Sequence, residues 1–343
     1  MLDLSIPEKK MTSEILIEEG IFKKSGKLLN ERYPKSRFAI VTDSKIKQIY
    51  GKQLNTIIPR SQIFSIPSGE KNKNLETIGK LTEQLIKSGI SRSDVIIGFG
   101  GGIITDIAGF LASVYMRGIK YIAIPTSLLG MVDASVGGKT GIDLVTKNIL
   151  GTFYLPELIL MDTDFLMTFQ NKKRMSGFGE IVKYAAIADK SLFRDFEKNP
   201  PDLNVIIEKC VKIKVGVVQK DFKENGMRKI LNYGHTFGHA IESASDYKIT
   251  HDEAISIGMV ISNKIAQKLG KQDLKTAEKI KSALIKFNLP TELPKGITIK
   301  NLRDLIKKDK KRAEDKISFI IVPCLGSAEI IQLTVDEMIE LAK

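Results

Sequence analysis

The sequence predicts an α/β N-terminal domain with a mainly parallel, Rossmann-like sheet, followed by a mostly α-helical C-terminal domain. Short apolar runs alternate with helical patterns in the first half, whereas long segments with apolar residues at helical spacing fill the second half. The 343 residues suffice for two cores, so we expect domains over 1–165 and 166–343. Ligands of such sheets bind beyond the carboxyl ends of the strands, so we expect the active site in the interdomain cleft.

Five short runs rich in isoleucine and valine are predicted to form the sheet of the first domain. They cover residues 38–42, 63–66, 95–98, 121–124 and 158–161. Each run ends at a turn signal, and a helical pattern often follows it, as in residues 75–87. This alternation is typical of a parallel sheet that is covered by helices.

The second domain is predicted to consist of long helices and one late hairpin. Apolar residues recur with a period near 3.6 in five segments. These predicted helices cover residues 177–188, 203–219, 228–245, 253–269 and 276–287, and the predicted strands of the hairpin cover 317–322 and 330–333.

The charge balance and the cysteines narrow the classes of function. Lys and Arg number 53 against 40 acidic residues, a formal net charge of +13. Aromatic side chains do not interleave with the basic runs, so we expect an anionic small molecule as the ligand and no nucleic acid. No apolar run approaches the roughly 18 residues of a membrane span, and the N-terminal stretch lacks a signal-peptide pattern. The two cysteines match no metal or redox spacing, which is typical of reduced thiols in the cytoplasm. We therefore expect a cytoplasmic protein, and the lack of a membrane-spanning run indicates no membrane partner.

A glycine-rich turn at residues 98–102 joins a predicted strand to the start of a predicted helix. Consecutive glycines let the backbone approach a ligand, and the amide groups at the helix start favour a phosphate. The third glycine of the usual dinucleotide motif would fall at Ile103, so a tight turn without a ligand remains an alternative. A second turn at 68–73 and Asp43 at the end of another strand offer carboxylates and cations, which together suggest a nucleotide cofactor.

The three histidines of the chain lie close together in the sequence. Arg228, Asn232, His235, His239 and Glu242 are spaced 4, 3, 4 and 3 apart, so one continuous helix would place them on one polar face. Such a face suggests the wall of a cleft. His235 and His239 could bind one divalent metal together, with a third histidine or a carboxylate, although a pair of satisfied histidines is the alternative.

Several motifs together resemble one family, 3-dehydroquinate synthase. They are GGGIITD at 100–106, YMRG at 115–118, VGGKTG at 136–141 after Asp133, GEIVK at 179–183 and LNYGHTFGHAIE at 231–242. The resemblance implies a homodimeric lyase of the shikimate pathway that uses NAD and one divalent metal, zinc or cobalt. Its reaction would convert 3-deoxy-D-arabino-heptulosonate 7-phosphate to 3-dehydroquinate and phosphate. The implied steps are transient oxidation by NAD, phosphate elimination, re-reduction, ring opening and intramolecular aldol closure.

The resemblance also implies a role for individual residues. The metal ligands would be Glu180, His235 and His251, which leaves His239 as a substrate-facing acid/base or phosphate contact. The further substrate and catalytic residues would be Lys139, Lys183, Lys214, Arg228, Asn232, Lys310, Asp133 and, reaching a neighbouring subunit, Arg117. The NAD contacts would be Asp43, Ser68, Gly69, Glu70, Lys71, Asn72, Lys73, Gly101, Gly102, Ile103, Ile104, Thr105, Asp106, Thr126, Ser127, Lys139, Lys147, Phe165, Leu166, Met167 and Thr168.

Three other functions remain open at this point. A second kind of sugar-phosphate cyclase, making an inosose or a valiolone, would share the fold, NAD and metal. An NAD-dependent polyol dehydrogenase would not need so many cations for a phosphate and a carboxylate. A basic nucleic-acid-binding module would bind DNA in a salt-sensitive manner and be indifferent to chelators.

Overall fold

The computed structural model describes residues 11–145, 147–167, 176–198, 201–309 and 316–343. The chain forms two compact units. Unit 1 contains the described residues up to Thr126 and the segment Ala134–Asp164, and unit 2 contains Ser127–Asp133 and the described residues from Phe165 onward. The function of each unit and the placement of the active site between domains stay predictions.

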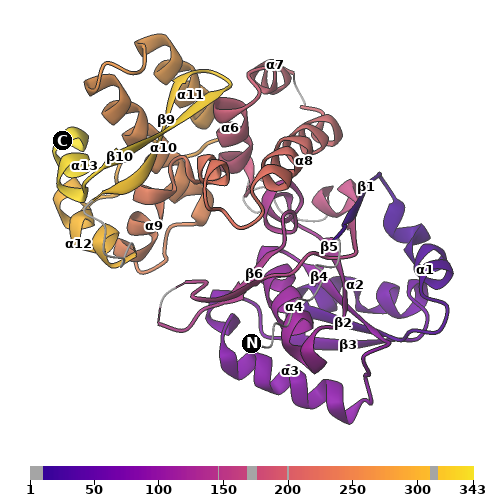
Figure 1. Ribbon diagram of the computed structural model, residues 1–343. Helices are drawn as coiled ribbons and strands as arrows, with labels where there is room; N and C mark the ends of the chain where they lie inside the picture. Colours follow the sequence, from indigo (N-terminus) through magenta and orange to yellow (C-terminus); the bar gives the residue numbers. More distant parts are fainter. Residues whose placement is uncertain (1–10, 146, 168–175, 199–200, 310–315) are drawn as a thin grey trace, which may run out of the picture. The chain divides into compact units, whose positions relative to one another are not determined.

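A six-stranded parallel sheet organises unit 1 (Figure 1). The inner strands β4, β5 and β2 are buried along almost their whole length, as expected for a sheet covered on both faces. All five predicted strands are present, so the predicted Rossmann-like sheet is confirmed. In spatial order the strands are β1 (Glu14–Ile17), β8 (Leu158–Met161), β5 (Lys120–Pro125), β4 (Val95–Gly100), β2 (Phe38–Asp43) and β3 (Ser61–Ile66).

Four helices connect the strands of unit 1, and a short antiparallel hairpin packs beside one of them. The helices are α1 (Ile21–Arg32), α2 (Ser44–Ile57), α3 (Leu75–Lys87) and α4 (Gly102–Val114), and the hairpin strands are β6 (Lys139–Ile142) and β7 (Leu150–Phe153). Gly109 lets α4 approach the hairpin, because a Cβ atom there would lie 2.4 Å from Thr140 Cγ2. The sequence did not predict the hairpin, whose strands are only 4 residues long.

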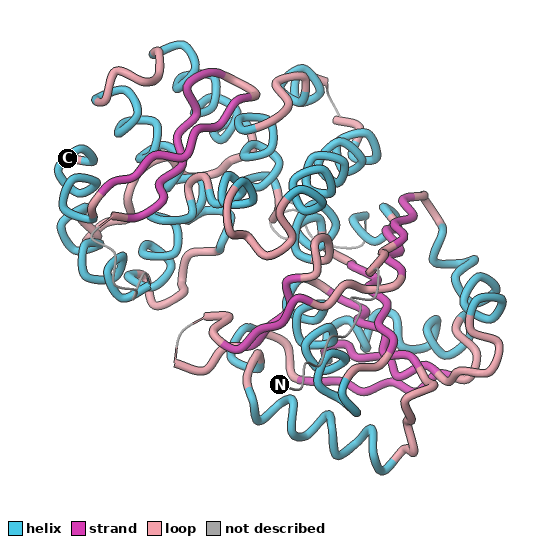
Figure 2. The backbone as a smooth tube through the Cα atoms, viewed as in Figure 1, coloured by secondary structure: helices cyan, strands magenta, loops and turns pink. Residues whose placement is uncertain are grey.

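Unit 2 is built from helices around one antiparallel ribbon (Figure 2). Its core includes Phe237, Ile241 and Ile257 beside Phe319 of the ribbon. No helix in the described ranges is both long and apolar enough to cross a membrane. The elements are α6 (Phe178–Ile187), α7 (Leu192–Glu197), α8 (Leu203–Lys220), α9 (His235–Ala244), α10 (His251–Lys268), α11 (Leu274–Lys286), α12 (Ile299–Asp309), α13 (Val335–Ala342), β9 (Ile317–Cys324) and β10 (Ser327–Leu333).

The continuous helix predicted over residues 228–245 is wrong. A 3₁₀ helix, η5 (Met227–Asn232), comes first, the chain then turns at Gly234 with φ 81°, and α9 begins at His235. The chain passes very close to α10 at this turn, because a Cβ atom on Gly258 would lie 2.0 Å from the Gly234 carbonyl oxygen. Arg228 and Asn232 therefore do not share one helix face with His235, as their spacing had suggested.

Candidate active site

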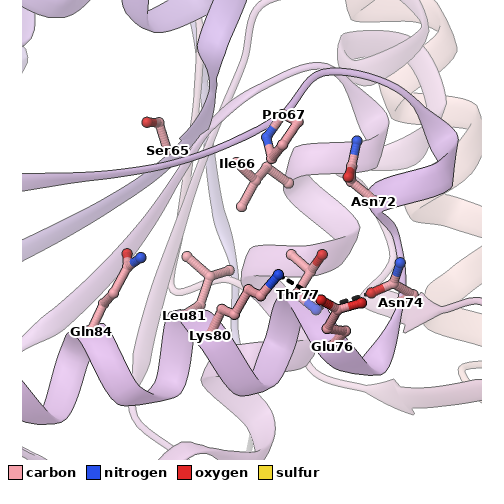
Figure 3. Close-up of a pocket in the computed structure, with 10 residues that line it drawn as sticks. All are labelled: Ser65, Ile66, Pro67, Asn72, Asn74, Glu76, Thr77, Lys80, Leu81 and Gln84. Atoms are coloured by element: carbon pink, nitrogen blue, oxygen red, sulfur yellow. Dashed lines mark hydrogen bonds and ion pairs between the residues drawn. The ribbon is translucent and has the colours of Figure 1, made fainter.

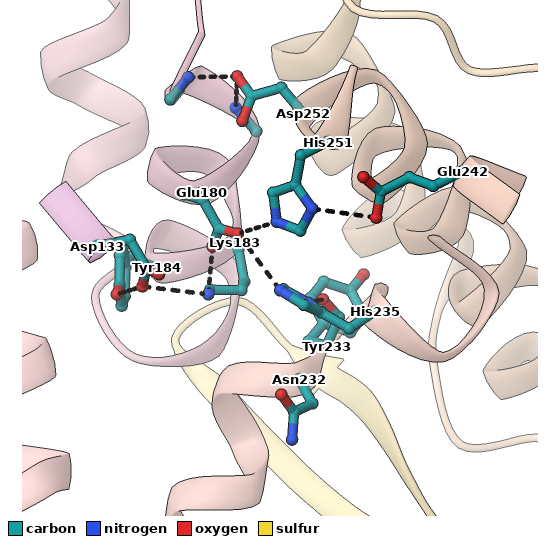
Figure 4. A network of polar contacts seen from close by, with 12 residues as sticks. Asp133, Glu180, Lys183, Tyr184, Asn232, Tyr233, His235, Glu242, His251 and Asp252 are labelled. Carbon is teal, nitrogen blue, oxygen red and sulfur yellow. Dashed lines mark hydrogen bonds and ion pairs between the residues drawn. The ribbon is translucent and has the colours of Figure 1, made fainter. Parts of the chain in front are cut away.

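Three side chains from separate helices converge in unit 2 (Figure 4). Glu180 lies in the first turn of α6, and His235 and His251 are the first residues of α9 and α10. Glu180 Oε1 lies 3.3 Å from His235 Nε2 and 3.2 Å from His251 Nε2. Glu180 itself is fully buried, so the carboxylate is held between the two imidazoles in the protein interior.

Both histidines are oriented through their other ring nitrogen. His235 Nδ1 lies 3.1 Å from the Tyr233 carbonyl oxygen, which can only accept, so that nitrogen carries the proton. His251 Nδ1 lies 3.3 Å from Glu242 Oε2. Each Nε2 is thereby directed at Glu180. Two imidazoles held in this way beside a carboxylate are a common ligand set for zinc.

The charges of this cluster are mutually dependent. Burial raises the pKa of Glu180, but Lys183 and His235 lower it more, and the result lies well below the usual range. Burial lowers the pKa of His235 to about 4, so its imidazole is neutral at physiological pH. Burial also lowers the pKa of His251, but Glu180 and Glu242 raise it to about 10. The site thus holds one proton on His251 that a bound cation would displace.

A second group of potential ligands shares one member with the first. His239, Glu242 and His251 offer donor atoms within 4.8 Å of one another, as do Glu180, His235 and His251. Among the described residues, neither group contains both His235 and His239. The structure therefore does not favour the metal-binding pair suggested by their spacing of four.

Two lysines surround Asp133 next to this cluster. Lys214 Nζ donates to the Asp133 carbonyl oxygen at 2.5 Å and to Oδ1 at 2.8 Å, and Tyr184 donates its hydroxyl to Oδ1 at 2.5 Å. Lys183 Nζ lies 3.9 Å from the same Oδ1 and also pairs with Glu180. Burial raises the pKa of Asp133, but Lys214 and Lys183 lower it below its ordinary value. This arrangement concentrates two cations beside the candidate metal ligands.

The remaining predicted substrate residues lie in different surroundings. Arg228 is buried and donates to the Phe222 carbonyl oxygen at 2.5 Å, and Asn232 donates to Glu224 Oε1 at 3.0 Å. Lys139 is exposed on β6 of unit 1. Arg117 is exposed in a turn where Met116 and Arg117 both have positive φ, 49° and 64°. Lys310 lies outside the described residues.

The carboxyl edge of the sheet in unit 1 gathers the other predicted residues. The strand order reverses between β2 and β4, because β2 leads outward to β3 and β4 leads the other way to β5. Ligands of α/β sheets bind at such a point. Asp43 ends β2, caps α2 and accepts a hydrogen bond from Ser68 Oγ at 2.6 Å. Gly101 precedes α4, whose first amide groups have no side-chain cap and suit an anion.

Lys73 connects three segments of this edge. It is buried, and its Nζ lies 2.5 Å from Asp106 Oδ2 and 2.5 Å from Asn148 Oδ1. Burial lowers the pKa of Lys73, but Asp106 raises it above its ordinary value. Lys147 lies 3.9 Å from Glu70 across the same region. Through its bonds to Asp106 and Asn148, Lys73 holds the turn at residues 68–73 in place, whether or not it also contacts a ligand.

The other described residues predicted to contact NAD lie at four places in the fold. Gly69 precedes the 3₁₀ turn η1 (Glu70–Asn72), which includes Lys71, and Gly102, Ile103, Ile104 and Thr105 open α4. Thr126 follows β5 and donates its amide to the Gly100 carbonyl at 2.9 Å. Ser127 belongs to unit 2. The 3₁₀ helix η4 (Thr163–Met167) begins in unit 1, and its last three residues, Phe165, Leu166 and Met167, belong to unit 2. Thr168 lies outside the described residues.

A small pocket opens beside this edge, between the end of β3 and α3 (Figure 3). Its volume of about 150 Å³ is below that of usual cofactor sites, so it can hold only part of a dinucleotide. Asn72 links it to the predicted NAD-binding turn. It is lined by Ser65, Ile66, Pro67, Asn72, Asn74, Glu76, Thr77, Lys80, Leu81 and Gln84.

Comparisons with known proteins identify the family. The profile of the 3-dehydroquinate synthase N-terminal part matches residues 63–176, and that of the C-terminal part matches residues 177–312. The 3-dehydroquinate synthase of Streptococcus mutans serotype c is 38% identical over 352 aligned residues, covering 99% of this chain and 98% of that protein. This chain belongs to the 3-dehydroquinate synthase family.

Solved structures place the 3-dehydroquinate synthase fold among sugar-phosphate cyclases. One is 2-epi-5-epi-valiolone synthase from Streptomyces hygroscopicus subsp. jinggangensis 5008 with NAD⁺ and Zn²⁺ bound, at TM-score 0.89 and 26% identity, covering 99% of this chain and 98% of that one. Another is 2-deoxy-scyllo-inosose synthase complexed with carbaglucose-6-phosphate, NAD⁺ and Co²⁺, at TM-score 0.85 and 25% identity, covering 96% and 95%.

The sequence did not single out three residues that complete the cluster. Tyr184 contacts Asp133, Asp252 contacts the start of α6, and Glu242 orients His251 although only its place on a polar face had been noted. No signal in the sequence pointed to Asp252 or Tyr184, because their burial and their contacts are seen only in the structure.

Proposed function

We propose that this protein is a 3-dehydroquinate synthase, which converts 3-deoxy-D-arabino-heptulosonate 7-phosphate to 3-dehydroquinate and phosphate with NAD and one zinc or cobalt ion. The observation that carries the proposal is the convergence of Glu180, His235 and His251 in a chain of this family. The NAD⁺ and Zn²⁺ or Co²⁺ bound in the two solved relatives support the cofactors.

The donor set fits a divalent metal. It offers two imidazole Nε2 atoms and one carboxylate, and four-coordinate catalytic zinc sites commonly use three protein ligands and leave one position for substrate. When bound, the metal would polarise a substrate hydroxyl, and NAD would take up and return one hydride.

The proposed reaction is balanced without an external oxidant. The substrate is oxidised at its C5 hydroxyl, and the new ketone acidifies the adjacent C–H bond, so loss of that proton expels phosphate. The ketone is then reduced by the hydride that was removed. The ring opens, and an intramolecular aldol addition forms the carbocycle. The net change is loss of phosphate with no net oxidation.

The cations of unit 2 suit a substrate with a phosphate and a carboxylate. Lys183 and Lys214 are both anchored to Asp133, which fixes their two side-chain nitrogens at one place. Fixed donors of this kind stabilise anionic groups strongly where water is excluded. Arg228 and Asn232 are the proposed further contacts. His239, grouped with Glu242 and His251, is the proposed acid/base or phosphate contact.

The sheet edge of unit 1 is the proposed NAD site. Asp43 would bind ribose hydroxyls, and the uncapped amides that open α4 would bind the pyrophosphate. We also propose a homodimer in which Arg117 reaches the neighbouring active site. The two successive positive φ angles at Met116 and Arg117 support a turn built to present this side chain, because such strain concentrates at functional positions.

The decisive experiment measures two products at once. Purified protein with NAD and zinc should release inorganic phosphate from 3-deoxy-D-arabino-heptulosonate 7-phosphate, while absorbance at the NADH band shows no sustained increase. A matched reaction with the Glu180→Gln variant should release no phosphate. Steady NADH formation, or no phosphate release by the wild type, would sink the proposal.

A related cyclase activity is the second candidate, because both solved relatives named above make other carbocycles. The 38% identity to the Streptococcus mutans enzyme favours dehydroquinate formation. Parallel assays with glucose 6-phosphate, the sugar mimicked by carbaglucose-6-phosphate, separate the two. Faster phosphate release from glucose 6-phosphate than from the heptulosonate would favour the second candidate.

A further inference from the structure

Asp252 joins the starts of two helices that carry candidate metal ligands. It follows His251 in the first turn of α10, is only 2% exposed, and directs its carboxylate at the start of α6 (Figure 4). Its Oδ2 accepts hydrogen bonds from the backbone amides of Gly177 and, at 3.2 Å, Gly179. Gly179 directly precedes Glu180, so these bonds fix the backbone from which that ligand extends.

Helix α6 has no cap of its own. Its N-cap residue is Gly177, at φ 119°, and no side chain there accepts from the first amide groups. The first amides of a helix need an acceptor when they are buried, and a carboxylate at this end also interacts favourably with the helix dipole. Asp252 supplies that acceptor from another helix.

Helix α10, in contrast, does not need Asp252 for its own start. Thr250 accepts from the Glu253 amide, and Glu253 accepts from the Thr250 amide, which forms a complete capping box. The carboxylate of Asp252 is therefore available to α6. The fit is close, because a Cβ atom on Gly179 would lie 3.1 Å from both Asp252 Oδ1 and the Asp252 carbonyl oxygen.

We propose that Asp252 is a positioning residue that caps α6 from α10 and thereby holds Glu180 at the distance from His251 that a divalent metal requires. A buried carboxylate is costly unless it is hydrogen-bonded, so its presence here needs a reason other than packing. This inference rests on the metal site of the proposed function.

The test compares zinc affinity with stability in two cap variants. Asp252→Ala should weaken zinc binding at least about tenfold, in the range that follows loss of groups supporting metal ligands. Asp273→Ala is the matched control, since Asp273 caps α11 through the Thr276 amide at 2.6 Å and lies outside both candidate ligand groups. Its zinc affinity should stay within twofold of the wild type. Competition with a chromophoric chelator gives the affinities, and urea unfolding of the zinc-free proteins gives the stabilities.

Two further measurements separate positioning from general destabilisation. The zinc concentration for half-maximal phosphate release should rise in Asp252→Ala, while the rate at saturating zinc recovers most of the wild-type value. Asp252→Asn keeps an acceptor oxygen but loses the charge. Its zinc affinity should lie between those of the wild type and Asp252→Ala, about threefold weaker than the wild type, because removal of the whole group is expected to cost about tenfold.

The outcomes are distinct. Unchanged zinc affinity in Asp252→Ala, or a loss no greater than in Asp273→Ala, overturns the inference while the proposed function stands. If Asp252→Ala does not fold, unchanged affinity in Asp252→Asn overturns it. Failure of the wild type to bind zinc, or equal binding by a Glu180→Gln variant, overturns the metal site and the inference with it.

Discussion

The sheet edge in unit 1 and the cluster in unit 2 make candidate ligand sites in different ways. At the sheet edge, main-chain amides and turn residues follow successive strands, as Asp43 ends β2 and Gly101 follows β4. In the cluster, Glu180, His235 and His251 come from three helices and meet only through the fold. A site made from backbone depends on local turns, whereas a site made from converging side chains depends on how its helices pack.

The sheet edge and the cluster also differ in their charged groups. The sheet edge offers helix amides together with the partly buried ion pair Lys73–Asp106. In the cluster, the buried carboxylate Glu180 and the half-buried carboxylate Asp133 lie against two buried lysines. Removal of one charge from the cluster should therefore disturb several neighbours at once.

The division of roles among the histidines gives the largest expected effect. His251→Ala should weaken zinc binding more than about 100-fold, because it removes a direct ligand instead of a supporting group. His239→Ala should keep zinc and lose rate. Zinc content after dialysis, measured by mass spectrometry, and phosphate release check both variants. Equal zinc retention by the two would contradict the assignment of His251.

Replacement of Glu242 tests whether orientation of a ligand matters as much as the ligand. Glu242→Gln removes the charge facing His251 Nδ1 and should weaken zinc binding about tenfold, the lower end for such supporting groups. Glu337→Gln is the control, since Glu337 completes an exposed capping box at the start of α13. The same chelator competition applies. A Glu242→Gln variant with the affinity of the control would mean that the negative charge of Glu242 is not needed to orient His251.

A lysine at the sheet edge tests whether the two sites can be altered separately. Lys73→Met leaves Asp106 and Asn148 without their shared partner and should weaken NAD binding about tenfold, because loss of one member of a buried ion pair disturbs its surroundings. Lys87→Met, at an exposed position at the end of α3 and outside the predicted NAD contacts, should change it little. Calorimetric titration gives the NAD affinities. A parallel loss of zinc affinity in Lys73→Met would show that the sites are coupled.

The smallest expected effect concerns a carboxylate at the opposite end of the sheet. Burial raises the pKa of Asp94, but hydrogen bonds from Arg37 and Ser91 lower it to about 2. Because the unfolded carboxyl titrates near 4, this group stabilises the fold above about pH 4 and loses that effect as the pH falls toward 2.

Asp94→Asn should therefore lower the free energy of unfolding by about 1 kcal/mol at pH 7, since the partly exposed Arg37 limits the value of the pair. The difference from the wild type should shrink between pH 4 and pH 2. Urea unfolding across this range measures it, with NAD and zinc affinities expected to stay unchanged. A difference independent of pH would show that ionisation of Asp94 is not the cause.

The sequence was most informative where the decisive pattern is local. The five strands, the glycine turn before α4 and the late hairpin all follow from periodicity and turn residues over short stretches. The helix break before His235 could not be seen in this way, because it lies where Gly258 approaches Gly234 from another helix. Spacing alone therefore joined Arg228 and Asn232 to a helix face that does not exist.

The partners of the candidate site were harder to predict than its central residues. Family motifs pointed to Glu180, His235 and His251, and the fold brings these three together. Asp252 and Tyr184 act through contacts with segments more than fifty positions away, and no local pattern distinguishes such a carboxylate or phenol from any other buried one. The exposed Lys139 and Arg117 belong to unit 1, whereas the cluster belongs to unit 2.

The glycine crossing between α9 and α10 sets a limit on how this chain can vary. Gly234 and Gly258 let the two backbones touch directly before His235, since a single methyl group on Gly258 would overlap the Gly234 carbonyl. The spacing between the imidazoles of His235 and His251 thus depends on two glycines that have no side chain and take no part in the chemistry. Evolution or redesign of this region must therefore keep glycine at positions 234 and 258. The outer faces of both helices can vary freely.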